Sequence, residues 1–354
     1  MDELEREKLQ QERLVAALED AGVRWGQVAD CGPLSGGTFG AVFGVRTTGG
    51  ERIVVKLAPS SDRPVLEYER GILGTEAWYL RTARERTDVP VATVLAVSAQ
   101  DEERPGDHLV TGYCPGKPWN ELQQEVGPED RDHLRRELGG HVARMHALDG
   151  AEGFGYPALS LGPLRPSWRE TFLAMVDSVL GDAARFDVTL PRPAKEIREV
   201  LTAESGSLDE VTVPRLVHWD LWDGNILAEL APQGAPDAGR PRITALIDAE
   251  RALWGDPVAE FVSLGLFHDI TRDEPFWEGY RAAGGSVTFD AAARNRMALY
   301  RAHLYLIMWV EAVPRKFDAG HLAWLERDIY GPLGEMIDAW AGGRGPMEHV
   351  WPRE

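Results

Sequence analysis

Three polar residues with fixed spacing follow an apolar stretch in the second half of the chain. His218, Asp220 and Asn225 lie in the run HWDLWDGN, directly after Arg-Leu-Val. Phosphoryl transfer needs a carboxylate that orients the attacking hydroxyl and accepts its proton, and an amide oxygen that holds a magnesium ion. Asp220 and Asn225 have the side chains for these two roles. Because such a triplet arises by chance in roughly 1–2% of chains this long, it needs support from elsewhere.

A second carboxylate supplies part of that support. Asp248 ends the apolar stretch RITALI about twenty residues later, in the run IDAE. Magnesium is held by a few carboxylate or amide oxygens together with phosphate oxygens and water, so Asn225 and Asp248 are a sufficient protein contribution. The structural alternative is a hairpin with polar ends, in which Asp220 caps a turn and Asn225 adopts a left-handed conformation.

A glycine-rich turn lies between two predicted strands near the N-terminus, in the run LSGGTFG. Glycines at such a turn let backbone N–H groups approach phosphates, although many glycine-rich hairpins bind nothing. The residues predicted to contact a nucleotide here are Ser35, Gly36, Gly37 and Thr38.

Lys56 ends the next apolar strand, RIVVK. An unpaired ammonium group there would be costly to bury, so we expect a carboxylate partner. Glu76 is preferred over Glu67 and Glu69 because it flanks an apolar helical stripe that should face the sheet. The alternative is a lysine whose ammonium group reaches solvent.

The hydrophobic patterns predict which elements position these residues. A helix over 2–21 is followed by a β-meander over 28–57, a helix over 66–84 and two strands over 90–99 and 108–113. A Pro/Gly-rich stretch near residue 115 marks a boundary. Beyond it, we expect helices over 129–148, 166–183 and 193–204, then strands over 213–219, 225–230 and 242–250, and then helices to the C-terminus. The fold class expected is α+β.

Composition excludes several classes of function. The 354 residues include 38 basic and 57 acidic ones, giving a net charge of −19, which disfavours nucleic acid and favours cationic ligands. No stretch is long and apolar enough to span a membrane, and the first twenty residues lack a signal-peptide core, so a cytoplasmic protein is expected. The two cysteines, Cys31 and Cys114, are too few for a disulfide framework and lack zinc spacing.

Taken in order, these motifs resemble the aminoglycoside phosphotransferase and choline kinase superfamily, from about Leu34 to Glu260. The resemblance implies a two-lobe, protein-kinase-like fold, with a nucleotide-binding lobe over 1–114 and a catalytic and substrate-binding lobe over 115–354. It implies ATP or GTP as phosphate donor and Mg²⁺ as metal. The small lobe would contain an antiparallel sheet and one helix, and the larger lobe would be mainly helical.

The same resemblance assigns roles to individual residues. Asp220 would be the base, His218 would brace its loop, and Asn225 and Asp248 would hold magnesium. Lys56, paired with Glu76, would contact phosphates. The backbone of Gly112, Tyr113 and Cys114 would hold the adenine, and Asp256 would stabilise the catalytic loop. Trp219 stands where the family usually has glycine, and we expect it to reshape the substrate mouth.

The resemblance does not select the acceptor, because the family phosphorylates antibiotics, choline, ketosamines and other alcohols. We expect specificity to lie in 160–210 and 265–340, where acids could form an anionic wall and tryptophans flat surfaces; the structural alternative is that they are solvated or core residues. The candidates are Asp269, Asp273, Glu274, Glu278, Glu311, Trp277 and Trp309. An antibiotic or aminosugar is the first hypothesis, a ketosamine or amino alcohol the second, and an inactive nucleotide-binding scaffold the third.

Overall fold

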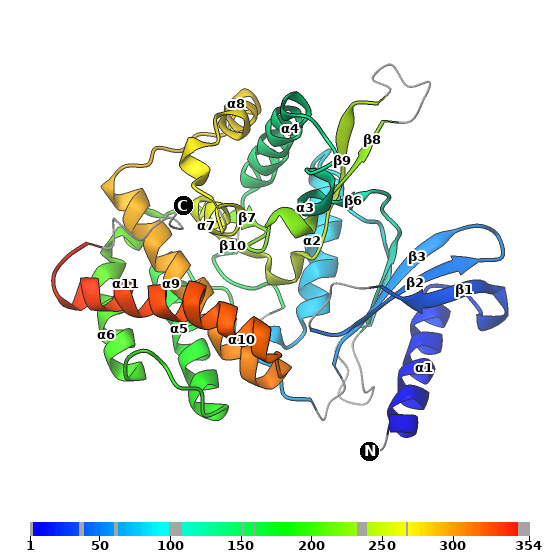
Figure 1. Cartoon of the computed structure of the whole chain (residues 1–354), viewed down its shortest axis with the longest axis horizontal. Helices are drawn as coiled ribbons and strands as arrows, with labels where there is room; N and C mark the ends of the chain where they lie inside the picture. The colour runs from blue at the N-terminus through cyan, green and yellow to red at the C-terminus, as the bar shows by residue number, and fades with distance from the viewer. Residues whose placement is uncertain are drawn as a thin grey trace.

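The structure is a computed structural model that describes most of the chain. The described residues are 3–34, 39–59, 63–98, 108–150, 152–158, 160–231, 239–266 and 268–345. Figure 1 shows a sheet with helix α1 beside it on the right and a larger, mainly helical part on the left, with α2 between them. This arrangement matches the predicted α+β class.

The N-terminal part is a five-stranded antiparallel sheet of order β1-β2-β3-β5-β4 with helices α1 and α2. Its elements are α1 (Glu3–Asp20), β1 (Val28–Pro33), β2 (Ala41–Thr47), β3 (Arg52–Leu57), α2 (Ile72–Arg86), β4 (Val94–Val97) and β5 (His108–Gly112). Side chains alternate between the two faces of a strand. On β3 this alternation buries Val55 and Leu57 in a cluster with Leu14 and Leu18 of α1, and turns Lys56 to the opposite face.

Helix α2 begins six residues later than predicted. Gly71 adopts a left-handed conformation with φ of 70°, which interrupts the helical pattern and leaves a short 3₁₀ turn over Glu67–Glu69. Leu73, Ala77 and Leu80 of α2 are buried, as the apolar stripe predicted. The break separates Glu69 from Glu76, so the two carboxylates serve different parts of the molecule.

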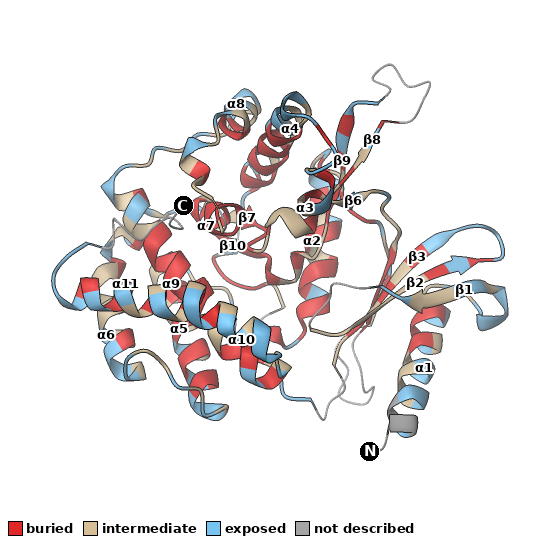
Figure 2. Cartoon of the chain, in the orientation of Figure 1, coloured by how far each residue is buried: buried red, intermediate tan, exposed pale blue. Residues whose placement is uncertain are grey.

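The C-terminal part consists of helices around two small antiparallel sheets, of orders β6-β8-β9 and β10-β7. Its strands are β6 (Lys117–Pro118), β7 (Arg215–Val217), β8 (Ile226–Leu230), β9 (Pro241–Leu246) and β10 (Leu253–Gly255). Its helices are α3 (Trp119–Leu122), α4 (Pro128–His146), α5 (Trp168–Arg185), α6 (Ala194–Glu204), α7 (Pro257–Leu264), α8 (Glu274–Ala282), α9 (Ala291–Arg315), α10 (Ala319–Leu325) and α11 (Gly331–Ala341). Buried residues follow the inner sides of α2, α4 and α9 (Figure 2).

Helices α4 and α8 approach each other closely because both carry glycine at the crossing. A Cβ atom on Gly139 would lie 2.0 Å from the Phe276 carbonyl oxygen, and one on Gly279 would lie 1.8 Å from that of Arg136. Any larger residue would therefore push the helices apart.

Within the described residues, no helix is long and apolar enough to cross a membrane.

Two loops at the ends of neighbouring strands carry the predicted chemistry. The loop 218–225 joins β7 to β8, and Asp248 follows β9. The Ile247 N–H donates to the Asn225 carbonyl oxygen at 3.0 Å, which ties the two loops together. The residues picked out by motif spacing are thus placed at one edge of the β8–β9 hairpin, facing the N-terminal sheet.

Candidate active site

A cavity of about 300 Å³ lies between the N-terminal sheet and helix α9. Gly40, Ala41 and Val42 line one end, from the start of β2, and residues of α9 line the other. Lys56, Asp220, Asn225 and Asp248 all line it as well. Residues that lie far apart in the sequence therefore meet in a single cavity.

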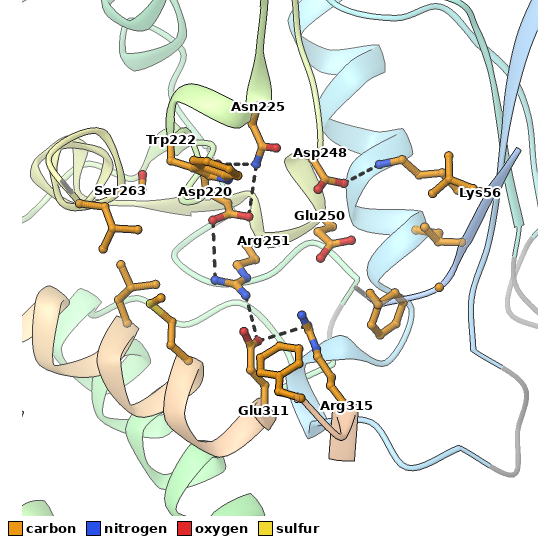
Figure 3. Close-up of a pocket in the computed structure, with 18 of the residues that line it drawn as sticks. Lys56, Asp220, Trp222, Asn225, Asp248, Glu250, Arg251, Ser263, Glu311 and Arg315 are labelled. Carbon is orange, nitrogen blue, oxygen red and sulfur yellow. Dashed lines mark hydrogen bonds and ion pairs between the residues drawn. The ribbon is translucent and has the colours of Figure 1, made fainter. Parts of the chain in front are cut away.

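Lys56 is held between the carboxylates of Glu76 and Asp248. Figure 3 shows its contact with Asp248. Its Nζ lies 2.7 Å from Glu76 Oε1 and 2.6 Å from Asp248 Oδ1, and Glu76 is almost fully buried. Burial disfavours the charged ammonium group, yet Asp248 and Glu76 together hold the pKa of Lys56 above its usual value. Lys56 is therefore a fixed cation on the floor of the cavity, paired with Glu76 rather than with Glu67 or Glu69.

The loop after β7 is held in place by hydrogen bonds from its own polar side chains. The Asn225 side-chain amide donates to the Asp220 carbonyl oxygen at 2.7 Å. The buried His218 ring contacts the Ile247 carbonyl oxygen through Nε2 at 3.0 Å and accepts the Asp220 N–H at Nδ1 at 3.3 Å. Burial lowers the pKa of His218, which keeps the ring neutral and able to donate and accept at once. His218 thus connects the loop to the residue preceding Asp248.

Asp220 projects into the cavity with one side-chain oxygen near Arg251. Arg251 Nη1 lies 3.7 Å from Asp220 Oδ1. Burial raises the pKa of Asp220 to about 7, and the nearby Arg251 opposes this rise. The Asp220 carboxylate is about one-fifth exposed, so it can be reached from the cavity.

Glu260, rather than Asp256, holds the backbone of this loop. The fully buried Glu260 carboxylate accepts the N–H groups of His218 at 2.7 Å and Trp219 at 3.1 Å. Asp256 instead caps helix α7 through the Val258 N–H and accepts hydrogen bonds from Arg296 and Tyr300. The role that the family resemblance implied for Asp256 is therefore wrong here, because its carboxylate faces α9 instead of the loop.

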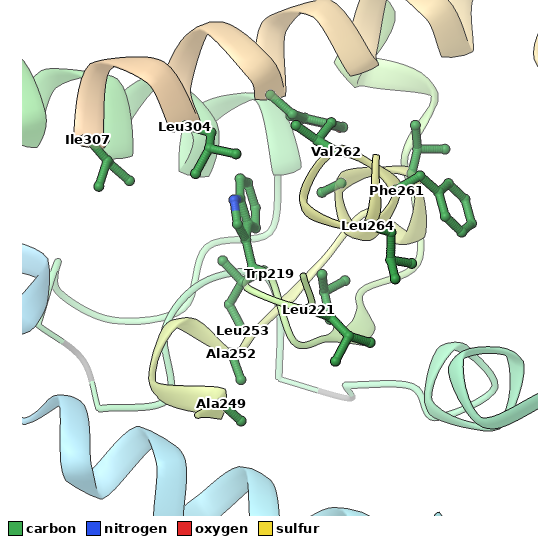
Figure 4. Close-up of a cluster of buried hydrophobic side chains, with 14 of the residues drawn as sticks. Trp219, Leu221, Ala249, Ala252, Leu253, Phe261, Val262, Leu264, Leu304 and Ile307 are labelled. Carbon is green, nitrogen blue, oxygen red and sulfur yellow. The ribbon is translucent and has the colours of Figure 1, made fainter. Parts of the chain in front are cut away.

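Trp219 adopts a left-handed backbone conformation with φ of 60°. Glycine adopts this conformation without strain, which explains why it is favoured at this position, and any other residue costs about 1–3 kcal/mol. The Trp219 side chain is 2% exposed and packs against Trp168, Tyr300 and His303 beside Leu304 (Figure 4). The expectation that Trp219 reshapes the substrate mouth is wrong, since its ring points into the core.

A chain of buried ion pairs extends from Asp220 to the far wall of the cavity. Glu311 lies 3.1 Å from Arg251 and 3.2 Å from Arg315 (Figure 3). Arg315 in turn lies 2.5 Å from Glu69. Each of these side chains is no more than 10% exposed. The motifs did not identify Arg251, Arg315 or Glu260, although a charged residue within an apolar run is a signal of a buried partner.

Several predicted contact residues are placed differently or are not described. Ser35, Gly36, Gly37 and Thr38 lie outside the described residues. The N–H groups of Gly112 and Tyr113 donate to the carbonyl oxygens of Thr93 and Arg52. Cys114 is half-buried, and none of these three residues lines the cavity. The adenine contacts of Gly112, Tyr113 and Cys114 therefore stay a prediction.

Most of the predicted acceptor-binding residues face other parts of the protein. Asp273 pairs with Arg135 at 2.6 Å, Glu278 pairs with Arg136 at 2.6 Å, and Glu274 pairs with Arg281. The remaining candidates behave similarly: Asp269 caps a 3₁₀ turn, Trp277 is buried, and Trp309 donates to the Thr189 carbonyl oxygen. Of the seven, Glu311 alone lines the cavity, so the structural alternative holds for the others.

The side chains around Lys56 have the chemistry of a magnesium site. Glu76, Asp248 and Glu250 each offer a carboxylate oxygen, and these oxygens lie within 4.8 Å of one another. Because the Asn225 amide nitrogen donates to Asp220, its oxygen is directed toward Asp248 (Figure 3). Oxygen donors from carboxylates and amides are those that magnesium prefers. Asp248 and Asn225 therefore fit the metal.

Comparisons with known proteins agree with this arrangement. The model of the phosphotransferase enzyme family matches residues 30–300. No curated protein sequence matches the chain significantly. Several solved structures share its fold, among them the following three. A thermostable mutant of aminoglycoside phosphotransferase APH(4)-Ia, in ternary complex with AMP-PNP and hygromycin B, has a TM-score of 0.59 at 18% identity, over 90% of this chain and 96% of that one.

The other two come from enzymes described by different acceptors. A candidate fructosamine-3-kinase from Thermobifida fusca YX-ER1 has a TM-score of 0.59 at 21% identity, over 92% of this chain and 97% of that one. Macrolide 2'-phosphotransferase MphH from Brachybacterium faecium has a TM-score of 0.53 at 19% identity, over 90% and 98%. With a family match over residues 30–300 and the same fold, this chain belongs to the phosphotransferase enzyme family and has the kinase-like architecture of small-molecule phosphotransferases.

Proposed function

We propose that the protein transfers the γ-phosphoryl group of ATP to a hydroxyl group of a small organic molecule, with magnesium as the metal. The observation that carries this proposal is the convergence of Lys56, Asp220, Asn225 and Asp248 on one cavity between the sheet and the helical part. These are the side chains that phosphoryl transfer requires. GTP would serve equally well by the same chemistry.

Each residue then has a defined task. Asp220 accepts a hydrogen bond from the acceptor hydroxyl and takes its proton as the oxygen attacks the γ-phosphorus. The bond between this phosphorus and the oxygen bridging to the β-phosphate breaks, and ADP leaves. Lys56, fixed by Glu76, contacts the phosphates as a cation, while Asn225 and Asp248 hold magnesium, which neutralises phosphate charge when bound.

For the acceptor, an antibiotic is the first candidate and an ordinary metabolite the second. The first is supported by fold neighbours named for aminoglycosides and macrolides, and would make the protein a resistance or self-protection enzyme. The second is supported by a neighbour named as a fructosamine-3-kinase. A nucleotide-binding scaffold without turnover is the third candidate. It is disfavoured because the complete residue set lies in one cavity.

A coupled ATP-consumption assay with magnesium tests the proposal. The purified protein is screened against aminoglycosides, macrolides, ketosamines, aminosugars, amino alcohols and uncharged alcohols, and products are examined by mass spectrometry. Addition of one phosphate to an acceptor supports the proposal, and the acceptor's class decides between the two enzyme hypotheses. Magnesium-dependent nucleotide binding without transfer to any acceptor would favour the scaffold.

A further inference from the structure

The end of the cavity beyond Asp220 is the place where an acceptor must lie, since the opposite end contains Lys56. We call it the acceptor end. Its walls come from the end of α7, the middle of α9 and α10. Its apolar lining consists of Trp222, Leu266, Leu304, Met308, Phe317 and Trp324. An acceptor body placed here is therefore surrounded mainly by aliphatic and aromatic side chains.

The charged groups at the acceptor end neutralise one another. Among the described residues that line it beyond Asp220, Glu311 is the single carboxylate. Glu311 contacts both Arg251 and Arg315, at 3.1 and 3.2 Å, and is 9% exposed. A carboxylate shared by two arginines has no negative charge to offer to a ligand ammonium group.

The other carboxylates of the cavity belong to its opposite end or to the transfer point. Glu250 lies on the Lys56 side, where its oxygen is within 4.8 Å of those of Glu76 and Asp248. Asp220 stands at the transfer point, where the reacting hydroxyl is required. A cationic acceptor would therefore bring its charge to a wall that contains two arginines and, among the described residues, no uncompensated acid.

At the acceptor end, the Ser263 hydroxyl is hydrogen-bonded within the protein and the His321 ring packs against two aromatic rings. Ser263 Oγ accepts the Leu221 N–H at 3.1 Å and donates to the Glu260 carbonyl oxygen at 3.0 Å. The His321 ring lies tilted by 32° against Phe317, at a centroid distance of 4.1 Å, and meets the Trp324 ring edge to face at 5.4 Å. Flat rings and aliphatic groups therefore make up most of the surface that this wall presents to an acceptor.

We propose that the acceptor is an uncharged alcohol whose reacting hydroxyl is attached to an apolar, ring-containing body. This inference rests on the proposed function and narrows its substrate class. It reverses the expectation from the net charge of −19, because the acidic side chains predicted to line the site are either elsewhere or compensated. The body contacts the apolar wall, and Asp220 is the polar group that receives the hydroxyl.

A comparison of two probes with the same ring and hydroxyl group tests the inference. Cyclohexanol and trans-4-aminocyclohexanol differ by one ammonium group, and their binding to the full chain with AMP-PNP and magnesium can be compared by saturation-transfer NMR. We expect saturation of cyclohexanol to exceed that of the amine by about tenfold, because the ammonium group loses water without gaining a carboxylate. Stronger binding of the amine, or no binding of cyclohexanol, would overturn the inference.

A matched pair of variants checks that the signal comes from the acceptor end. Met308→Glu adds an uncompensated carboxylate at the half-buried Met308, and Met308→Gln has the same shape without the charge. We expect Met308→Glu to shift the preference toward the amine and Met308→Gln to leave it on the side of cyclohexanol. An unchanged preference in Met308→Glu would show that the probes bind elsewhere and would overturn the inference.

The screen of acceptors separates this inference from the proposed function. If cyclohexanol binds as expected but no alcohol gains a phosphate group, the proposed function is refuted. The inference that the acceptor end prefers an uncharged ligand is then still supported. If hygromycin B is phosphorylated with a KM that rises steeply with salt, transfer is established and the uncharged acceptor is refuted, because salt screens attraction between opposite charges.

Discussion

Replacing Glu260 by glutamine should disable the catalytic loop while leaving the cavity lining intact. The Glu260 carboxylate accepts two backbone N–H groups, from His218 and Trp219, and is fully buried. Glutamine has nearly the same shape, but one of its two terminal atoms is an NH₂ group. Because a donor would then face a donor, one loop N–H group loses its partner in a site without access to water.

The size of the effect follows from these two hydrogen bonds. A hydrogen bond to a charged group contributes about 1.5–3 kcal/mol, and leaving a buried donor unsatisfied costs about 1–3 kcal/mol. Glu260→Gln should therefore lower the free energy of unfolding by about 2–4 kcal/mol. Asp220 directly follows the two residues affected, and a displacement of about 1 Å in a reacting group can reduce kcat about 100-fold.

Asp256→Asn is the matched control, because Asp256 is also a buried carboxylate associated with α7. It accepts hydrogen bonds from Arg296 at 2.9 Å and Tyr300 at 2.7 Å, so its loss should lower stability by a similar amount. Its carboxylate does not contact the loop, so kcat should stay within about twofold of wild type. Urea unfolding measures stability, and the coupled assay measures kcat on the acceptor found in the screen.

Two results would refute this reasoning. An unchanged kcat in Glu260→Gln would mean that the loop keeps its position without the carboxylate. An equal loss of kcat in Asp256→Asn would mean that lower stability alone explains the defect. Either result would mean that a group other than Glu260 positions the loop.

Three further predictions concern the residues of the catalytic loop and its surroundings. Asp220→Asn should lower kcat by about 10²–10⁴-fold with nucleotide affinity almost unchanged, and unaltered turnover would remove Asp220 from the role of base. Asp248→Ala should abolish magnesium-dependent nucleotide binding, measured by calorimetry, and retained binding would place the metal elsewhere. Trp219→Gly should remove about 1–3 kcal/mol of backbone strain but lose about 3–5 kcal/mol of packing energy. The variant should therefore unfold at a lower urea concentration than wild type. A more stable variant would show that the backbone strain is the larger of the two energies.

The parts of the fold that sequence could predict are those in which local pattern and chemistry agree. The position of Lys56 at the end of an apolar strand predicted a carboxylate partner, and the apolar stripe of α2 identified Glu76 as that partner. The start of α2 was missed because a pattern of apolar spacing does not report that Gly71 is left-handed. Periodicity identifies faces better than it identifies ends.

The bracing of the site could not be predicted, because it depends on contacts between distant residues. Glu260 lies 42 residues from His218, and Glu311 lies 60 residues from Arg251. Spacing motifs describe neighbours along the chain, whereas these pairs form only when α7 and α9 pack around the loop. A charged residue in an apolar helix shows that a partner is required. The sequence does not show which partner it will be.

The contrast between net charge and local charge is a consequence of the same packing. The chain as a whole is strongly acidic, and a cleft in such a protein would be expected to attract cations. Yet charged side chains that are buried are found in ion pairs, because burying an isolated charge costs too much free energy. Glu311 can lie in the wall of the acceptor end because Arg251 and Arg315 accompany it, and the part of this wall that the structure describes contains no uncompensated acid. The requirement for a stable core thus removes from the site the charge that the composition suggested.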